Sequence, residues 1–159
     1  MIAQQLSPDA PERVGYQAAF EAEAQRKRYL ESGESFCVET VFSHTSKVEF
    51  VRNAREREYQ VNLIYIHLST GLYAARVLDR VDKGGHSVPP EKIEPRVHRL
   101  RANVRETLAL CDYVGLYDNS DSERPFELVL SIHDGIVHRH QTPLPAWVHD
   151  LAGASFTDR

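Results

Sequence analysis

Residues 61–68 read VNLIYIHL, and this stretch decides the fold class. Apolar and β-branched side chains occupy both alternating sets of positions, which is typical of a strand that is covered on both faces. Shorter apolar runs at residues 35–40 (SFCVET) and 112–117 (DYVGLY) predict two further buried strands. Strands of this kind belong to sheets that carry helices on both sides.

Helical patterns alternate with these strands. Ser7 is a candidate cap for the first helix, and Gly33 is placed to end it. We predict helices at residues 7–32, 43–59, 72–81 and 90–110. Alternating strands and helices predict an α/β fold with a mainly parallel sheet, in one domain that covers residues 1–159.

The C-terminal part has a different pattern. Asp134 and Gly135 separate apolar runs at residues 126–132 and 136–140, and Asp-Gly in this position predicts a β-hairpin. Residues 143–152, which include the single tryptophan, predict a short closing helix.

Composition excludes several classes of protein. A net charge of -4 and a pI near 6.1 argue against broad, salt-driven binding of nucleic acid. Neither a membrane span nor a signal peptide is expected, because the sequence has no apolar run near 18 residues and no basic segment followed by an apolar leader. Cys37 and Cys111 lie far apart without ligand spacing, which predicts a cytoplasmic location and two small apolar residues in strands. His138 and His140 lack a third ligand at a fitting spacing, so no metal site is expected.

Polar side chains follow each predicted strand of the parallel type. They are Glu39 and Thr40, Ser69 and Thr70, and Asp118, Asn119 and Ser120. Ligands of doubly wound folds bind at the carboxyl ends of the strands, so these side chains are candidates for a binding site. The alternative is that they only cap turns and helices.

Arginines form a second candidate group. Arg76 and Arg80 are spaced i,i+4 on one predicted helix, and Arg96 and Arg99 are spaced i,i+3 on the next. Because guanidinium groups donate paired hydrogen bonds to phosphate, two such helices suit a polyanion. The alternative is a pair of solvated helix faces.

Taken in order, these segments resemble the zeta-toxin-like family of P-loop kinases over roughly residues 1–120. The resemblance rests on IAQQLSPDAPE (2–12), SFCVET (35–40), VNLIYIHLST (61–70), ARVLDRVDKGGHSVP (75–89), PRVHR (95–99) and YDNS (117–120). Residues 121–159 fit the family only loosely.

The resemblance implies a three-layer kinase fold with a parallel sheet, and a reaction that uses ATP and Mg²⁺. Toxin members of the family phosphorylate a UDP-linked amino sugar and are bound by an antitoxin protein. Carried over residue by residue, Glu39 with Thr40 lies in the substrate pocket and Asn119 shapes the nucleotide side. Arg80 and Arg96 contact the ATP phosphates, and Arg76 and Arg99 are near alternatives for that role.

One family motif is absent from the sequence. A P-loop requires Gly-x4-Gly-Lys-Ser/Thr, and none of the four lysines lies in that context. In the family this loop and its central strand precede the segment that begins here at Met1. We therefore expect the chain alone to lack the central strand, to hold no tightly bound ATP and to be inactive. The alternative is a non-catalytic remnant or binding module of the same fold.

Overall fold

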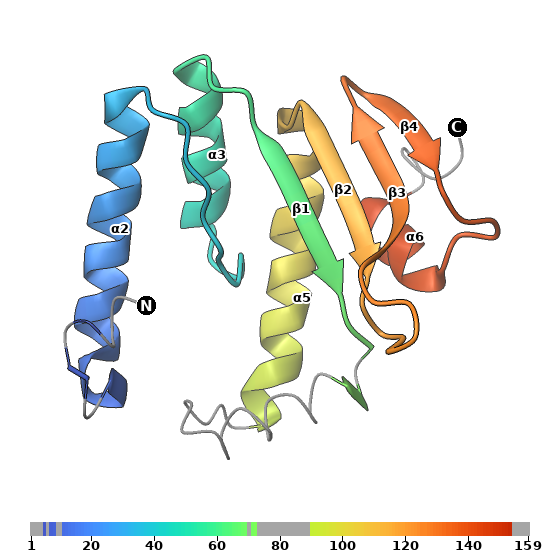
Figure 1. Cartoon of the computed structure of the whole chain (residues 1–159), viewed down its shortest axis with the longest axis horizontal. Helices are drawn as coiled ribbons and strands as arrows, with labels where there is room; N and C mark the ends of the chain where they lie inside the picture. Colours follow the sequence, from blue (N-terminus) through green and yellow to red (C-terminus); the bar gives the residue numbers. More distant parts are fainter. Residues whose placement is uncertain (1–4, 6, 9–10, 70, 73–89, 154–159) are drawn as a thin grey trace. The chain divides into compact units, whose positions relative to one another are not determined.

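The computed structural model describes residues 5, 7–8, 11–69, 71–72 and 90–153, drawn in colour in Figure 1. The chain divides into two compact units. Unit 1 comprises Met1–Thr40 with Asp79–Ser87, and unit 2 comprises Val41–Leu78 with Val88–Arg159.

Unit 1 is built around one helix. A 3-10 turn, η1 (Pro11–Val14), leads into α2 (Gly15–Ser32). Gly33 ends the helix with φ of 74°, as predicted, because only glycine adopts this left-handed conformation without strain. The predicted start at Ser7 is wrong, since α2 begins only after the prolines of the first segment, and Val14 holds the N-cap position.

The buried strand predicted at residues 35–40 is also wrong. This segment has no regular secondary structure, and all its residues are exposed except the half-buried Phe36. Phe36 stacks on Tyr29 of α2 with ring centroids 5.6 Å apart. A strand needs a neighbour to bond its backbone groups, and no described strand pairs with this segment. Cys37 is accordingly exposed instead of buried in a strand.

Unit 2 contains a four-stranded sheet in the order β1-β2-β3-β4 (Figure 1). The strands are β1 (Asn62–His67), β2 (Tyr113–Asp118), β3 (Glu127–His133) and β4 (Ile136–Arg139). β1 and β2 are parallel, whereas β2 with β3 and β3 with β4 are antiparallel. The α/β class is confirmed, but the described sheet is mixed and not mainly parallel.

The hairpin predicted from Asp134 and Gly135 is present between β3 and β4. Both residues have positive φ, 50° and 78°, as a tight two-residue turn between twisted strands requires. β3 and β4 therefore add an antiparallel edge to the parallel pair β1–β2.

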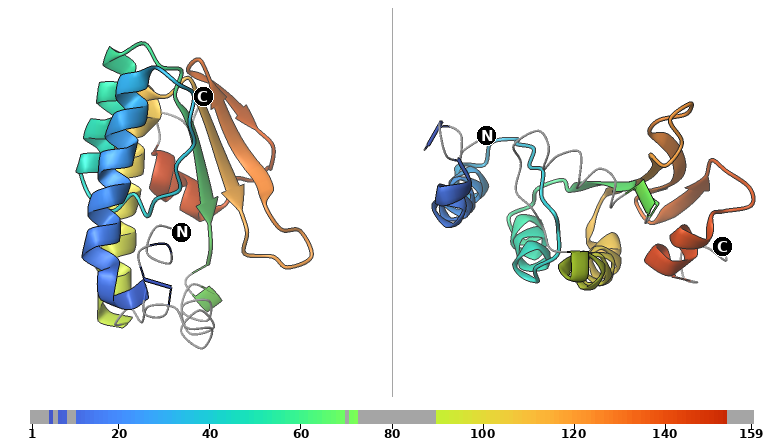
Figure 2. Two further views of the ribbon diagram at one scale, coloured as in Figure 1. Left: turned by 60° about the vertical axis from the view of Figure 1, so that its left-hand side comes forward. Right: turned by 90° about the horizontal axis from the view of Figure 1, so that it is seen from below.

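The described helices of unit 2 lie on one face of its sheet (Figure 2). They are α3 (Ser46–Glu56), α5 (Pro90–Thr107) with the short η2 (Leu108–Leu110), and α6 (Ala146–Ala152). Apart from Leu72, the predicted helix at 72–81 falls outside the described residues. On the opposite face of β1, Ile64 and Ile66 remain about half exposed.

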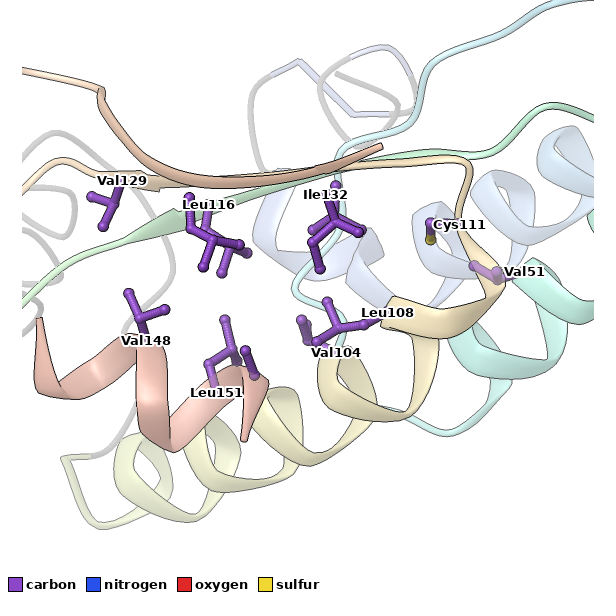
Figure 3. Packing of buried hydrophobic residues seen from close by; sticks show 12 residues of the cluster. Val51, Val104, Leu108, Cys111, Leu116, Val129, Ile132, Val148 and Leu151 are labelled. Carbon is purple, nitrogen blue, oxygen red and sulfur yellow. The ribbon is translucent and has the colours of Figure 1, made fainter. Parts of the chain in front are cut away.

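The core fills the space between the sheet and these helices (Figure 3). Its residues are Val51, Val104, Leu108, Cys111, Val114, Leu116, Val129, Leu130, Ile132, Val148, Leu151 and Ala152. Cys111 is buried as predicted, but it lies just before β2 and not within a strand. Because α6 supplies three of these residues, the C-terminal segment is part of the fold of unit 2.

Candidate functional site

The carboxyl ends of β1 and β2 meet at one edge of the sheet. His67 and Asp118 are the last residues of the two strands and are partners in the parallel register. The amide of Asn119 donates to the carbonyl of His67 at 2.9 Å, which extends the ladder by one residue. The structure therefore places the polar groups that follow these two strands side by side.

The turn after β2 is held by side-chain hydrogen bonds. The Ser120 amide donates to Oδ1 of Asp118 at 2.8 Å, so the aspartate closes the turn on its own backbone. The amide of Ser69, which follows β1, donates to Oγ of Ser120 at 2.9 Å. These bonds tie the segments after β1 and β2 together.

Trp147 of α6 completes this edge. Its Nε1 donates to Oδ2 of Asp118 at 2.9 Å. Its indole stacks on the imidazole of His67, with centroids 4.3 Å apart and an interplanar angle of 8°. The ring centroid of Tyr65 lies 5.9 Å from that of the same indole.

Burial and hydrogen bonds set the ionisation of this cluster. Burial lowers the pKa of His67; the charge of Asp118 opposes this effect and that of Arg101 adds to it. Burial alone would raise the pKa of Asp118, but the hydrogen bonds from Ser120 and Trp147, together with His67, lower it. Near neutral pH the cluster therefore holds a carboxylate beside an uncharged imidazole.

Asn119 is the predicted site residue that this edge presents most clearly. The residue is only 7% exposed, and its side-chain amide, unlike its backbone amide, has no hydrogen-bond partner among the described residues. It borders a depression of about 410 Å³ whose other walls include Leu72, Pro125 and Phe126. A side-chain amide in this position can donate to and accept from the edge of a planar ring, while apolar side chains pack on the faces of the ring.

A smaller depression of about 220 Å³ lies beside the first and carries more charge. Asp118, Asp121, Arg124 and Glu127 line it. Arg124 neutralises part of this acidity, because its guanidinium lies 3.3 Å from Asp121 and 3.4 Å from Glu127. With three carboxylates against one guanidinium, this depression keeps a net negative charge.

The described residues do not fit a magnesium ion. No three His, Cys, Asp or Glu side chains in the described part of the chain converge on one point. Both oxygens of Asp118 already accept hydrogen bonds, from Ser120 and Trp147. Magnesium in kinases is also held by the phosphates of its nucleotide, so a site made of these residues alone is not expected.

The other predicted site residues are distributed over both units. Arg96 and Arg99 lie on α5 and are exposed, and Nε of Arg96 donates to Oγ of Ser43 at 3.3 Å. Arg76 and Arg80 lie outside the described residues. Glu39 and Thr40 are exposed residues of unit 1. The structure thus places Asn119 in a defined setting and leaves the joint action of the arginines and Glu39 as a prediction.

Two residues of the cluster were not predicted as site residues. His67 is the next-to-last residue of the apolar run 61–68, and an ionisable side chain near the end of a predicted buried strand was the available signal. Trp147 was predicted only as part of a closing helix. Their contact joins residues 80 positions apart in the chain, and no local pattern reveals such a pairing.

Comparison with known proteins gives one result. A family model described as Zeta toxin matches residues 2–127, which is most of the chain. No curated protein and no solved structure matches the chain. Among the described helices, none has the length and apolar character needed to cross a bilayer.

Proposed function

The chain belongs to the zeta-toxin family, and from this premise we propose that it acts as a domain of an ATP-dependent kinase for a small molecule. The observation that best supports this proposal is the setting of Asn119. The residue is only 7% exposed, its side-chain amide bonds to no other described residue and borders the depression, and it follows the carboxyl end of a parallel strand pair, where α/β folds bind their ligands.

The nucleotide side of the site lies at the depression beside Asn119. The amide can donate to and accept from the edge of the base, while Pro125 and Phe126 offer apolar surface to its faces. This role agrees with the one that the family resemblance gives to Asn119.

The phosphates are bound by arginines. Arg80 and Arg96 stabilise the charge of the transferring phosphoryl group, and Arg76 and Arg99 bind the remaining phosphates. The exposure of Arg96 and Arg99 on α5 supports this proposal, because neither side chain is buried in the core.

The acceptor is a small molecule that carries a hydroxyl group, with a UDP-linked amino sugar as the first candidate. Glu39 orients or deprotonates this hydroxyl, and Thr40 contributes to the same pocket. The exposure of both side chains leaves them free for that role.

We propose that these 159 residues do not themselves supply the phosphate-binding loop. The sequence contains no Gly-x4-Gly-Lys-Ser/Thr motif, so its own backbone does not provide the usual cradle for phosphates. We expect the isolated chain to bind ATP weakly and to transfer no phosphate. The same absence supports the second candidate function, a non-catalytic binding module, for which a cytoplasmic antitoxin-like protein is the expected partner.

The test is phosphate transfer by the gene product at its native length, established by intact mass. Terminally labelled ATP, Mg²⁺ and UDP-linked amino sugars are the substrates. Arg80→Ala and Arg96→Ala should each lower turnover at least about 100-fold, since an arginine at the transferring phosphate contributes about 1,000-fold or more. Arg57→Ala, which removes the same charge from an exposed position after α3, is the control and should leave turnover unchanged.

The outcomes separate the two functions. Transfer by the wild type with three equally active variants would exclude the arginine assignments. No transfer, together with no stabilisation of the native-length protein by Mg²⁺-ATP in a thermal melt, would favour the binding module, because a ligand of the folded state must raise its stability.

A further inference from the structure

Trp147 joins three parts of the chain that are distant in sequence. It belongs to α6, which lies beyond residues 2–127 that match the family model. Its indole contacts the last residue of β1, His67, and the last residue of β2, Asp118. A segment outside the family match therefore touches both strand ends at the candidate site.

The position of the indole is itself fixed by packing. Its neighbours in α6, Val148 and Leu151, are fully buried in the core. Arg105 of α5 donates from Nε to the carbonyl of Leu151 at 3.1 Å and from its Nη2 to that of Asp150, which ties down the end of the helix. Trp147 thus projects from an anchored helix.

The contact with Asp118 determines how this carboxylate is oriented. One oxygen accepts from Trp147 and the other from the Ser120 amide, so the two donors hold the group from opposite sides. Without the indole N–H, the carboxylate can rotate and the Ser120 amide no longer has a fixed acceptor. The backbone amide of Asn119 donates to the carbonyl of His67, and the same indole covers the ring of His67.

We infer that Trp147 is a positioning residue that orients Asp118 and His67 and thereby holds the turn at 118–120, which presents Asn119 to the nucleotide. The inference rests on the proposed nucleotide role of Asn119. The positioning itself is a property of the folded chain and is measurable without catalysis.

The test compares two substitutions in the same helix by amide hydrogen exchange. Trp147→Phe keeps an aromatic ring over His67 and removes the N–H donor. This substitution should speed exchange of the Asn119 and Ser120 backbone amides at least about 10-fold relative to the amides of the sheet, because it removes a hydrogen bond to a charged group. Val148→Ala removes a core contact instead, and should lower the melting temperature without a selective effect on these two amides.

A second measurement uses the single tryptophan of the chain, which gives one indole N–H resonance in the NMR spectrum. Asp118→Asn should move this resonance and speed its exchange with solvent, because the indole loses a charged acceptor. An unmoved resonance, or equal exchange effects of Trp147→Phe and Val148→Ala, would overturn the positioning role.

Binding of a non-hydrolysable ATP analogue to the native-length product separates this inference from the function on which it rests. Affinity that falls several-fold in Trp147→Phe and not in Val148→Ala supports both. A selectively loosened turn with unchanged affinity would leave the positioning of the turn intact and overturn the proposed nucleotide role of Asn119.

Discussion

Two segments of similar composition have different structures in this chain. Residues 35–40 and β1 are both short and rich in apolar side chains, and both were predicted as buried strands. β1 is a strand with six residues in register with β2. Residues 35–40 form no strand and are largely exposed.

The difference shows what an apolar run requires to become a strand. β1 has a neighbour that bonds its backbone, and Leu63 and Tyr65 on one of its faces pack against the core. The described residues supply residues 35–40 with neither a paired strand nor a covering core. Composition therefore indicates where a strand can form, and the neighbouring chain decides whether it does.

The largest expected effect is a difference in the reaction rates of the two cysteines with a thiol reagent. Burial raises the pKa of the Cys111 thiol to about 12, and its Sγ donates to the carbonyl of Thr107 at 3.3 Å. Cys37 lies in the exposed segment. With a neutral thiol reagent, Cys37 should react at least about 1,000-fold faster, because Cys111 reacts only after unfolding.

Mass spectrometry of timed aliquots measures both rates in one sample. Cys37→Ser is the control, since it should abolish the fast phase alone. Slow labelling of Cys37 would mean that residues 35–40 are covered in solution, and the contrast between the two segments would then be lost.

The sequence predicted those features that depend on neighbouring residues. The end of α2 at Gly33 and the Asp134–Gly135 hairpin follow from local backbone conformation, and both are present. The position of Asn119 after β2 was also predicted, because a polar turn residue that follows an apolar run is visible in the sequence.

Features that depend on distant residues were missed. The stacking of Trp147 on His67 requires α6 to pack beneath the sheet, and the antiparallel edge requires β3 to pair with β2. The absence of a strand at 35–40 likewise depends on what lies beside it. Tertiary pairing, and not local propensity, decides these cases.

A matched pair of valine substitutions tests the same contrast energetically. Val114 of β2 is fully buried in the core, whereas Val38 in the other segment is 38% exposed. Val114→Ala should lower the free energy of unfolding by about 2 kcal/mol, through lost burial and the cavity that remains. Val38→Ala should change it by less than about 0.5 kcal/mol.

Urea denaturation of the wild type and both variants measures these values. Equal losses would show that residues 35–40 have a packed environment comparable with that of β2. A small loss for Val114→Ala would instead place Val114 outside the core.

The smallest expected effect concerns the residue that anchors the start of β1. Oδ2 of Asp112 accepts from the Val61 amide at 2.7 Å, and the guanidinium of Arg55 lies 2.6 Å from the same carboxylate. The Val61 hydrogen bond, with help from Arg55 and against a smaller effect of burial, lowers the pKa of Asp112. Its contribution to stability is therefore present above the ordinary aspartate pKa of about 3.9, and is lost as the pH falls through the lower folded value.

Asp112→Asn should lower the free energy of unfolding by about 1 kcal/mol near pH 6, where the wild-type carboxylate is charged. The difference between the two proteins should shrink as the pH falls below about 4, because the wild type then loses the same interaction. Glu39→Gln removes a charge from the exposed segment and should give no comparable trend. Urea titrations between pH 3 and 7 measure all three proteins, and a difference that grows as the pH falls would contradict the anchoring role, since it has the opposite sign to a depressed carboxyl pKa.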